Sequence, residues 1–108
     1  MEYELNGVNL IVHLPGELDH HSVRTLPQDI ELLFGEYEIR RIIFDFSAVT
    51  FMDSSGIGAV LGRYKRMCER DGEITLYGMN RRTRKLLEMA GVGKLAAMYE
   101  KKEEALKR

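Results

Sequence analysis

Hydrophobic and polar residues alternate over residues 8–14, which is the pattern of a β-strand with one buried face. A shorter strand-like run covers residues 2–5, and Asn6 and Gly7 separate the two runs. Because Asn-Gly pairs favour tight type I′ turns, this pattern predicts an antiparallel hairpin at the start of the chain.

Hydrophobic residues recur at helical spacing in three later segments. The first covers residues 23–34, where Pro27 is expected to delay the start of the helix or to kink it. The second begins at Ser54 and has a hydrophobic face that ends at Cys68, and the third follows an Asn80 cap. The side chains expected to be buried in this third helix are Leu86, Leu87 and Met89.

Short hydrophobic runs between these helices have the length and composition of strands. They cover residues 42–46, 74–78 and 95–99, and residues 47–53 are expected to form a loop after the first of them. Residues 101–108 are predicted to form a charged terminal helix that frays, because this segment has little to bury.

The alternation of strands and helices predicts a single α/β domain, with a mixed, mostly parallel sheet of about four to five strands. A parallel sheet that is covered on both faces has continuously hydrophobic strands, whereas here polar residues occupy alternating strand positions. These residues are Asn9, His13, Asp45, Glu73 and Thr75. We therefore expect the helices to lie mainly on one face of the sheet.

Composition and charge narrow the class of protein further. With 44% hydrophobic and 31% charged residues, the chain is too hydrophobic for a disordered protein and too charged for a membrane-spanning one. Its 16 basic and 17 acidic residues give a net charge of −1, so no overall field attracts nucleic acid or anionic lipid. The acidic start lacks the basic region of a secretory signal, and a single cysteine suits a reducing compartment. We expect a cytoplasmic protein without membrane or nucleic-acid partners.

Residues 51–58 lie between a predicted strand and a predicted helix, at the carboxyl edge of the sheet where functional side chains gather. Ser54 stands at the start of the helix, where unpaired N–H groups and the helix dipole favour a negative group. This position suits a phosphoserine, although the bare pattern favours a serine that simply caps the helix.

Two segments resemble a known family, the STAS-domain anti-sigma factor antagonists. Residues 51–65 read F-M-D-S-S-G-I-G-A-V-L-G-R-Y-K, which is similar to the family signature, and residues 16–21 read G-E-L-D-H-H. Together with the order of strands and helices, the resemblance spans nearly the whole chain and implies one STAS domain over residues 1–108. Pro27 departs from the family, whose first helix usually continues at this position.

The resemblance implies a partner switch that is controlled by phosphorylation. The unmodified protein is expected to bind a nucleotide-bound anti-sigma factor serine kinase and so to release a sigma factor, while phosphorylation ends this binding. A metal-dependent serine phosphatase is expected to remove the phosphate. The sigma F pathway of sporulation fits best, and an anti-sigma kinase of a stress-response pathway is the alternative. The chain itself is expected to be no enzyme, to hold no cofactor or metal, and to be a monomer when free.

The resemblance also assigns roles to individual residues. In the family's D-S-[ST]-G pattern the first hydroxyl residue is modified, and this residue maps onto Ser54. The acidic residue of the family's G-E-L-D loop maps onto Asp19, which is expected near Ser54 at the partner-facing edge. Asp53, Ser55 and Gly56 complete the expected partner-binding set. Three roles stay open for Asp53, which are capping the helix, repelling a phosphate and contacting the kinase.

Several other patterns suggest different chemistry, and a small serine hydrolase stays as the least favoured alternative function. A serine hydrolase would need glycine two residues before its nucleophile and a histidine after it, but Met52 precedes Ser54 and no histidine follows. The spacing of Gly56, Gly58 and Gly62 does not match a dinucleotide-binding loop, and close packing of the helix on the sheet explains it better.

The remaining charged and titratable clusters fit a solvated surface. His20 and His21 are adjacent, so their side chains diverge on a helix, and no carboxylate or cysteine cluster accompanies them as metal ligands. The basic run Arg81, Arg82, Arg84 and Lys85 lacks the interleaved aromatic residues of a nucleic-acid surface.

Overall fold

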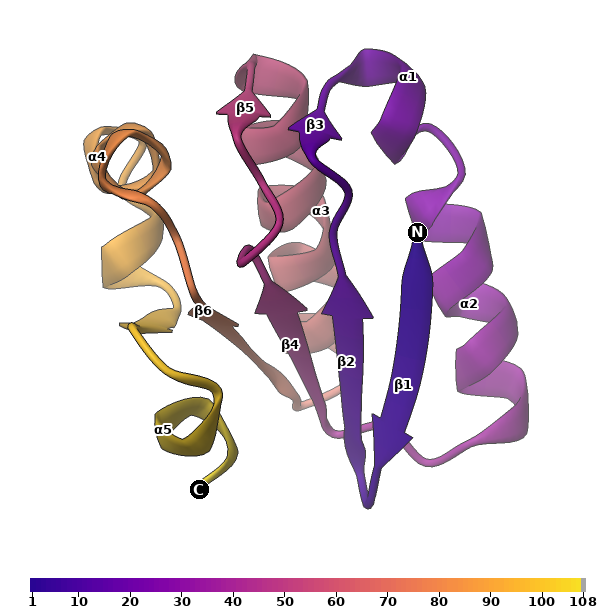
Figure 1. Ribbon diagram of the computed structural model, residues 1–108. Coiled ribbons are helices and arrows are strands. Elements are labelled where there is room, and N and C mark those ends of the chain that lie inside the picture. Colours follow the sequence, from indigo (N-terminus) through magenta and orange to yellow (C-terminus); the bar gives the residue numbers. More distant parts are fainter. Residues whose placement is uncertain (108) are drawn as a thin grey trace.

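The computed structural model describes residues 1–107, in which a five-stranded sheet carries helices on both faces (Figure 1). The strands within these residues are β1 (Glu2–Asn6), β2 (Asn9–His13), β3 (Glu17–Leu18), β4 (Arg41–Asp45), β5 (Phe51–Met52), β6 (Glu73–Tyr77) and β7 (Ala97–Tyr99). The helices are α1 (His20–Val23), α2 (Leu26–Glu36), α3 (Ser54–Glu69), α4 (Arg81–Met89) and α5 (Lys102–Leu106), with a 3-10 turn over Val92–Lys94. No helix among residues 1–107 has both the length and the hydrophobicity needed to cross a membrane.

The main sheet has the strand order β1-β2-β4-β6-β7. β1 pairs with β2 in antiparallel register, whereas β2, β4, β6 and β7 run parallel to one another. The predicted α/β fold, with an N-terminal hairpin and a mixed, mostly parallel sheet, is therefore confirmed.

The turn of the hairpin lies one residue later than predicted. Asn6 still pairs with Asn9, so Gly7 and Val8 are the central residues of the turn. Gly7 has a φ of +62°, and among the described non-glycine residues only Asp71 has a positive φ. A type I′ turn over Asn6 and Gly7 needs positive φ at both residues, so that prediction is wrong.

The larger hydrophobic core lies between the sheet and helices α2, α3 and α4 (Figure 1). Leu10 of β2 and Phe44 of β4 are fully buried in it. The opposite face of the same strands carries Ile11 and Ile43, which α5 covers through Ala105. The prediction that most helices lie on one face is confirmed, because only the short α5 packs on the other face among the described helices.

The C-terminal segment packs more firmly than its composition suggests. Ala105 of α5 is 0% exposed, and the Lys102 amine lies 4.0 Å from a carboxylate oxygen of Glu4 in β1. The predicted charged terminal helix is present over Lys102–Leu106, and it buries more against the sheet than its composition indicates. Arg108 lies outside the described residues.

The first predicted helix is divided into α1 and α2. α1 ends at Val23, and α2 starts at Leu26 with Pro27 in its first turn. Proline costs no helical hydrogen bond there, because the first N–H groups of a helix have no partner within it. Pro27 therefore helps to start α2, which confirms the predicted delay of the helix.

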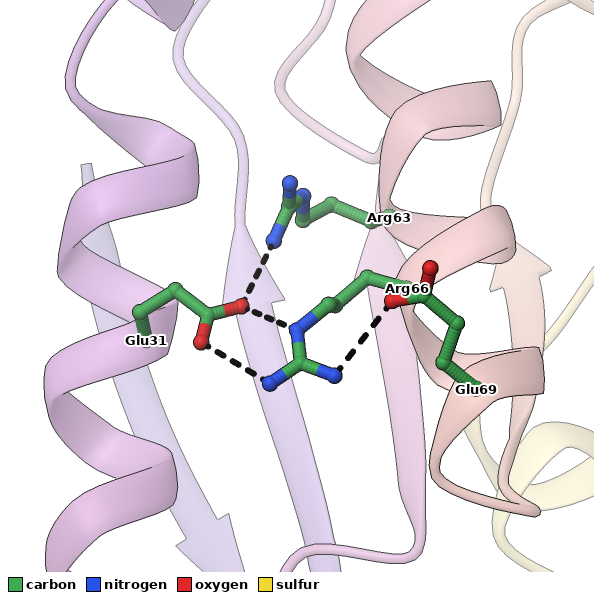
Figure 2. Close-up of polar contacts among 4 residues, drawn as sticks. All are labelled: Glu31, Arg63, Arg66 and Glu69. Atoms are coloured by element: carbon green, nitrogen blue, oxygen red, sulfur yellow. Dashed lines mark hydrogen bonds and ion pairs between the residues drawn. The ribbon is translucent and has the colours of Figure 1, made fainter.

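Ion pairs join α2 to α3 across the surface of the molecule (Figure 2). Glu31 accepts two hydrogen bonds from the Arg66 guanidinium, at 2.6 Å from Nε and 3.1 Å from Nη2. Nη1 of Arg63 lies 3.5 Å from Glu31, and Nη1 of Arg66 lies 3.5 Å from Glu69. These contacts connect the surfaces of α2 and α3.

Two side chains that the helical pattern predicts in the core are exposed. Cys68 of α3 faces solvent, and Met67 beside it is fully buried instead. Met89, the last residue of α4, is 75% exposed. A shift of one position at the end of a helix moves a side chain by about 100° around the axis, which is enough to exchange these roles.

A second sheet of two short strands, β3 and β5, was not predicted from the pattern. Glu17 pairs with Phe51, and Leu18 pairs with Met52, in parallel register. β3 lies in the segment that connects β2 to α1, and β5 lies in the segment that connects β4 to α3. We call these segments, residues 14–19 and 46–53, the two arms.

Candidate functional site

The two arms are joined by backbone hydrogen bonds along their length. The Gly16 carbonyl accepts from the Thr50 N–H at 2.8 Å and from the Phe51 N–H at 3.2 Å. Further along, the Leu18 carbonyl accepts from the Asp53 N–H at 3.3 Å. The arms therefore reach their tips side by side, where α1 and α3 begin (Figure 1).

Four of the five predicted site residues gather at these tips. Asp19 follows β3 just as Asp53 follows β5, and Ser54 and Ser55 form the first turn of α3. We call this group of Asp19, Asp53, Ser54 and Ser55 the arm-tip edge. The fifth predicted residue, Gly56, lies buried beneath it.

Asp53 is the N-cap of α3. Its backbone is extended, with φ −108° and ψ −172°, and its Oδ1 accepts a hydrogen bond from the Ser55 N–H at 2.8 Å. Such a cap satisfies one of the N–H groups that a helix leaves unpaired in its first turn. Capping is thus the one of the three roles of Asp53 that the structure displays directly.

Asp19 caps α1 in a reciprocal arrangement with Ser22. The Asp19 carboxylate accepts from the Ser22 N–H at 2.9 Å, and the Asp19 N–H donates to the Ser22 hydroxyl at 3.0 Å. The hydrogen bond from the Ser22 N–H lowers the pKa of Asp19 below its ordinary value, with a further contribution from the Ser22 hydroxyl. Asp19 is therefore a fixed negative charge at neutral pH.

The two serines of the arm-tip edge differ in accessibility. Ser54 is the first residue of α3 and is exposed, whereas Ser55 is half-buried and its N–H is held by Asp53. A phosphate on Ser54 would lie at the positive end of a 16-residue helix, close to N–H groups that favour an anion. Of the two serines, Ser54 is therefore the more accessible to solvent.

Gly56 lets α3 approach the arms closely. A Cβ atom at this position would lie 2.5 Å from Cγ of Met52 and 3.0 Å from Cδ2 of Leu18. A Cβ at Gly58 or Gly62 would meet nothing within 4 Å. The explanation by close packing is therefore confirmed for Gly56 and wrong for Gly58 and Gly62.

Phe51 is a candidate contact residue that the sequence reasoning missed. It is 44% exposed, although aromatic side chains are usually buried, and it lies on β5 two residues before Asp53. The neighbouring Met52 is buried, so the two residues alternate as in a strand. This alternation was the available signal, but two residues are too few to distinguish it from a loop.

The adjacent histidines of α1 carry no sign of a metal centre. His20 and His21 are exposed, in agreement with the prediction of solvated residues at the start of a helix. Across residues 1–107, no three His, Cys, Asp or Glu side chains are grouped so as to hold a metal ion. At the arm-tip edge Ser54 is exposed, and the negative charge comes from Asp19 and Asp53, which are half-buried.

Comparison with known proteins accounts for this arrangement of arms and helix. The model of the STAS domain family matches residues 1–105. The chain belongs to the STAS domain family. The resemblance carried by the segments around Asp19 and Ser54 is therefore confirmed at the level of the family.

Two curated relatives are named as antagonists of different anti-sigma factors. The chain is 35% identical to an anti-sigma F factor antagonist of Paenibacillus polymyxa, over 98% of this chain and 91% of the relative. It is 27% identical to an anti-sigma-B factor antagonist of Listeria monocytogenes, over 75% of this chain and 70% of the relative.

The solved structures of the anti-sigma factor antagonist SpoIIAA share the fold of this chain. The unphosphorylated form superposes with a TM-score of 0.86 at 32% identity, covering 99% of this chain and 93% of that one. The phosphorylated form, from Bacillus, superposes with a TM-score of 0.79 at 32% identity, covering 99% and 96%. STAS-domain anti-sigma factor antagonists are regulatory binding proteins, so the prediction that the chain is not an enzyme is confirmed.

Proposed function

We propose that this chain is an anti-sigma factor antagonist whose binding is controlled by phosphorylation of Ser54. The unphosphorylated chain binds a nucleotide-bound anti-sigma factor serine kinase through the arm-tip edge, and the sigma factor is released. The observation that carries this proposal is the exposed Ser54 at the first turn of α3, next to Asp53 and beside the Asp19 arm. The likeness to SpoIIAA, which has been solved in phosphorylated and unphosphorylated forms, supports it.

Phosphorylation ends binding by a local change of charge and volume. It adds about −1.5 to −2 charges at an edge that already carries Asp19 and Asp53. In the free protein, water and the N–H groups of α3 solvate the phosphate, so the fold has no reason to change. In the complex the partner strips that water, and a buried ion that is incompletely paired costs several kcal/mol.

The other residues of the site contribute in two ways. Three residues stand at the arm-tip edge and either contact the kinase directly or hold that edge in shape through hydrogen bonds within the chain; they are Asp19, Asp53 and Ser55. Gly56 is buried, so it acts on the partner indirectly, by allowing α3 to sit close to Met52 and Leu18. Phe51 adds exposed hydrophobic surface next to this edge.

The relatives support two candidate pathways. The higher identity to the sigma F antagonist of Paenibacillus polymyxa favours an anti-sigma F kinase and sporulation. An anti-sigma kinase of a stress-response pathway is the second candidate, supported by the relative from Listeria monocytogenes. In either pathway the chain acts in the cytoplasm as one STAS domain over residues 1–108, a metal-dependent serine phosphatase restores the unphosphorylated form, and the free chain is a monomer.

Phosphate mapping tests the assignment of the switch residue. The chain is incubated with its cognate anti-sigma factor kinase and ATP, and intact mass and fragment-ion spectra locate the phosphate. The wild type and the Ser55→Ala variant are expected to take up one phosphate on Ser54, while Ser54→Ala takes up none. Phosphate on Ser55 in the wild type, or undiminished uptake by Ser54→Ala, contradicts the assignment.

A further inference from the structure

A pair of titratable side chains stands where the two arms leave the main sheet. His13 is the last residue of β2 and Asp45 is the last residue of β4, and the two are register partners. Nδ1 of His13 lies 2.6 Å from Oδ2 of Asp45, while Nε2 lies 2.8 Å from Oε1 of Glu4 in β1. The imidazole thus bridges two carboxylates on neighbouring strands.

This geometry requires an imidazolium. A neutral imidazole has one N–H and one bare nitrogen, so it donates to only one of two carboxylates, whereas the protonated ring donates to both. The hydrogen bond to Glu4 raises the pKa of His13 above its ordinary value, and the Asp45 hydrogen bond adds to this against the opposing effect of burial. His13 is therefore charged in the arrangement described.

Asp45 also forms hydrogen bonds with the start of each arm. Its Oδ1 accepts from the Ser47 N–H at 2.8 Å, which fixes the start of the second arm. Its backbone carbonyl accepts from the Leu14 N–H at 3.1 Å, which fixes the start of the first arm. The His13–Asp45 contact thus ties the bases of the two arms that carry Asp19 and Ser54 at their tips.

We propose that protonated His13 is a positioning residue for the arm-tip edge, because it clamps the ends of β2 and β4 and so keeps the two arms in register. When His13 loses its proton, one of its two carboxylate contacts becomes a repulsion, and the hydrogen bonds between the arms open more often. The consequence for binding rests on the proposed function, since it assumes that the partner recognises both arm tips.

The charged groups nearest to His13 are carboxylates, which favour the protonated state. From β1, Glu4 contacts the ring and Glu2 is the register partner of His13. From β4 comes Asp45, whose carboxylate also interacts with Tyr77 of β6. α5 contributes Lys102, which lies 4.0 Å from Glu4, and Glu103, whose negative charge helps to raise the pKa of Tyr77.

The pH dependence follows from these groups. A cavity of about 510 Å³, lined by His13, Asp45, Glu2 and Met1 among others, opens beside the ring and gives it access to solvent protons. Because the pKa of His13 is raised by folding, the clamp is complete below the ordinary histidine pKa of about 6.5. It is lost as the pH rises through the higher pKa of the folded protein.

Hydrogen exchange of two inter-arm amides tests the clamp without any partner. The measurement uses a His20→Gln, His21→Gln background, in which His13 is the only histidine of the chain. The protection factors of the Thr50 and Asp53 N–H groups, which bond Gly16 and Leu18, are expected to fall about tenfold from about pH 6 to about pH 9.

Two substitutions of His13 bracket the expected behaviour. In His13→Gln the side chain is neutral at every pH and forms no ion pair with Glu4 or Asp45, so protection is expected to be low at both pH values. In His13→Arg the guanidinium stays charged and donates to both, so protection is expected to be high at both. The Leu76 N–H in the centre of the sheet reports global unfolding and is expected to keep its protection throughout.

The inference is overturned if wild-type protection at Thr50 and Asp53 does not change with pH. It is equally overturned if Leu76 loses protection by the same factor, because His13 then affects only global stability.

Affinity for the cognate kinase, measured for wild type and His13→Arg at both pH values, tests whether the His13 contacts influence binding. Wild-type affinity is expected to fall more than that of His13→Arg, and an equal fall in both removes the link to binding. An absence of binding by either protein at any pH refutes the proposed function, while the exchange data still decide the clamp.

Discussion

The backbone N–H of Asp53 donates a hydrogen bond to the carbonyl of Leu18 at 3.3 Å. This bond joins the N-cap of α3 to the end of β3, so the first turn of α3 is held by both arms. The position of Ser54 in that turn therefore depends on the arm that carries Asp19 as well as on its own arm.

Asp53 is expected to stabilise the fold through its cap. Asp53→Ala removes the acceptor for the Ser55 N–H and is expected to cost about 1 kcal/mol of unfolding free energy. For a domain of this size, that loss lowers Tm by about 4 °C. Asp53→Asn keeps an oxygen acceptor and is expected to stay close to the wild type. Thermal denaturation followed by circular dichroism measures both, and an unchanged Tm in Asp53→Ala contradicts the role of the cap.

Gly56 and Gly58 offer a matched pair of glycine substitutions in one helix. Gly56→Ala places a methyl group 2.5 Å from Met52 and is expected to destabilise by about 1–3 kcal/mol. Gly58→Ala meets no atom within 4 Å and is expected to stabilise by up to about 1 kcal/mol, because alanine favours the helix. Chemical denaturation compares the two variants. If both change stability in the same direction, close packing at Gly56 is not the reason for its glycine.

Asp19 is expected to contribute its charge to partner binding. Asp19→Asn keeps an oxygen that accepts from the Ser22 N–H but removes the negative charge, so the start of α1 is preserved. A loss of about tenfold in affinity for the cognate kinase is expected, as for a charge at the edge of an interface. Glu17→Gln, on the same arm, removes an exposed charge and serves as the control. Equal effects of the two substitutions in calorimetric titration would show that only net charge matters.

The ion pairs between α2 and α3 are expected to matter only at low ionic strength. Glu31→Gln removes the bidentate contact with Arg66 drawn in Figure 2, and it also removes the Arg63 contact. Because Glu31 is exposed and Arg66 is only half-buried, the loss in Tm is expected to be smaller than that of Gly56→Ala and to disappear in about 1 M salt. A loss that persists in high salt would show that packing rather than charge holds the helices together.

The main sheet and the longer helices were predictable because their periodic patterns extend over enough residues. α3 has 16 residues with repeated hydrophobic positions, and the Asp53-Ser54 junction marks its start. The edge location of Ser54 and Asp19 followed from parallel strands, whose carboxyl ends share one side of a sheet. These features depend on local pattern and on general rules of topology.

The features that were missed depend on contacts between distant residues. β3 and β5 have two residues each, too few to show alternation, and they exist because Gly16 and Thr50 meet across the arms. α5 has few hydrophobic residues, but it packs because the open face of the sheet presents Ile11 and Ile43. The His13 contacts with Glu4 and Asp45 likewise arise only from the register of three strands.

The most direct test of the proposed switch compares one binding constant in two states of Ser54. Calorimetric titration measures the affinity of the unmodified and the Ser54-phosphorylated chain for the cognate kinase with ADP present. Phosphorylation is expected to weaken binding by about 100-fold or more, which corresponds to at least about 2.7 kcal/mol. Equal affinities of the two forms would contradict the proposal that phosphorylation of Ser54 ends binding.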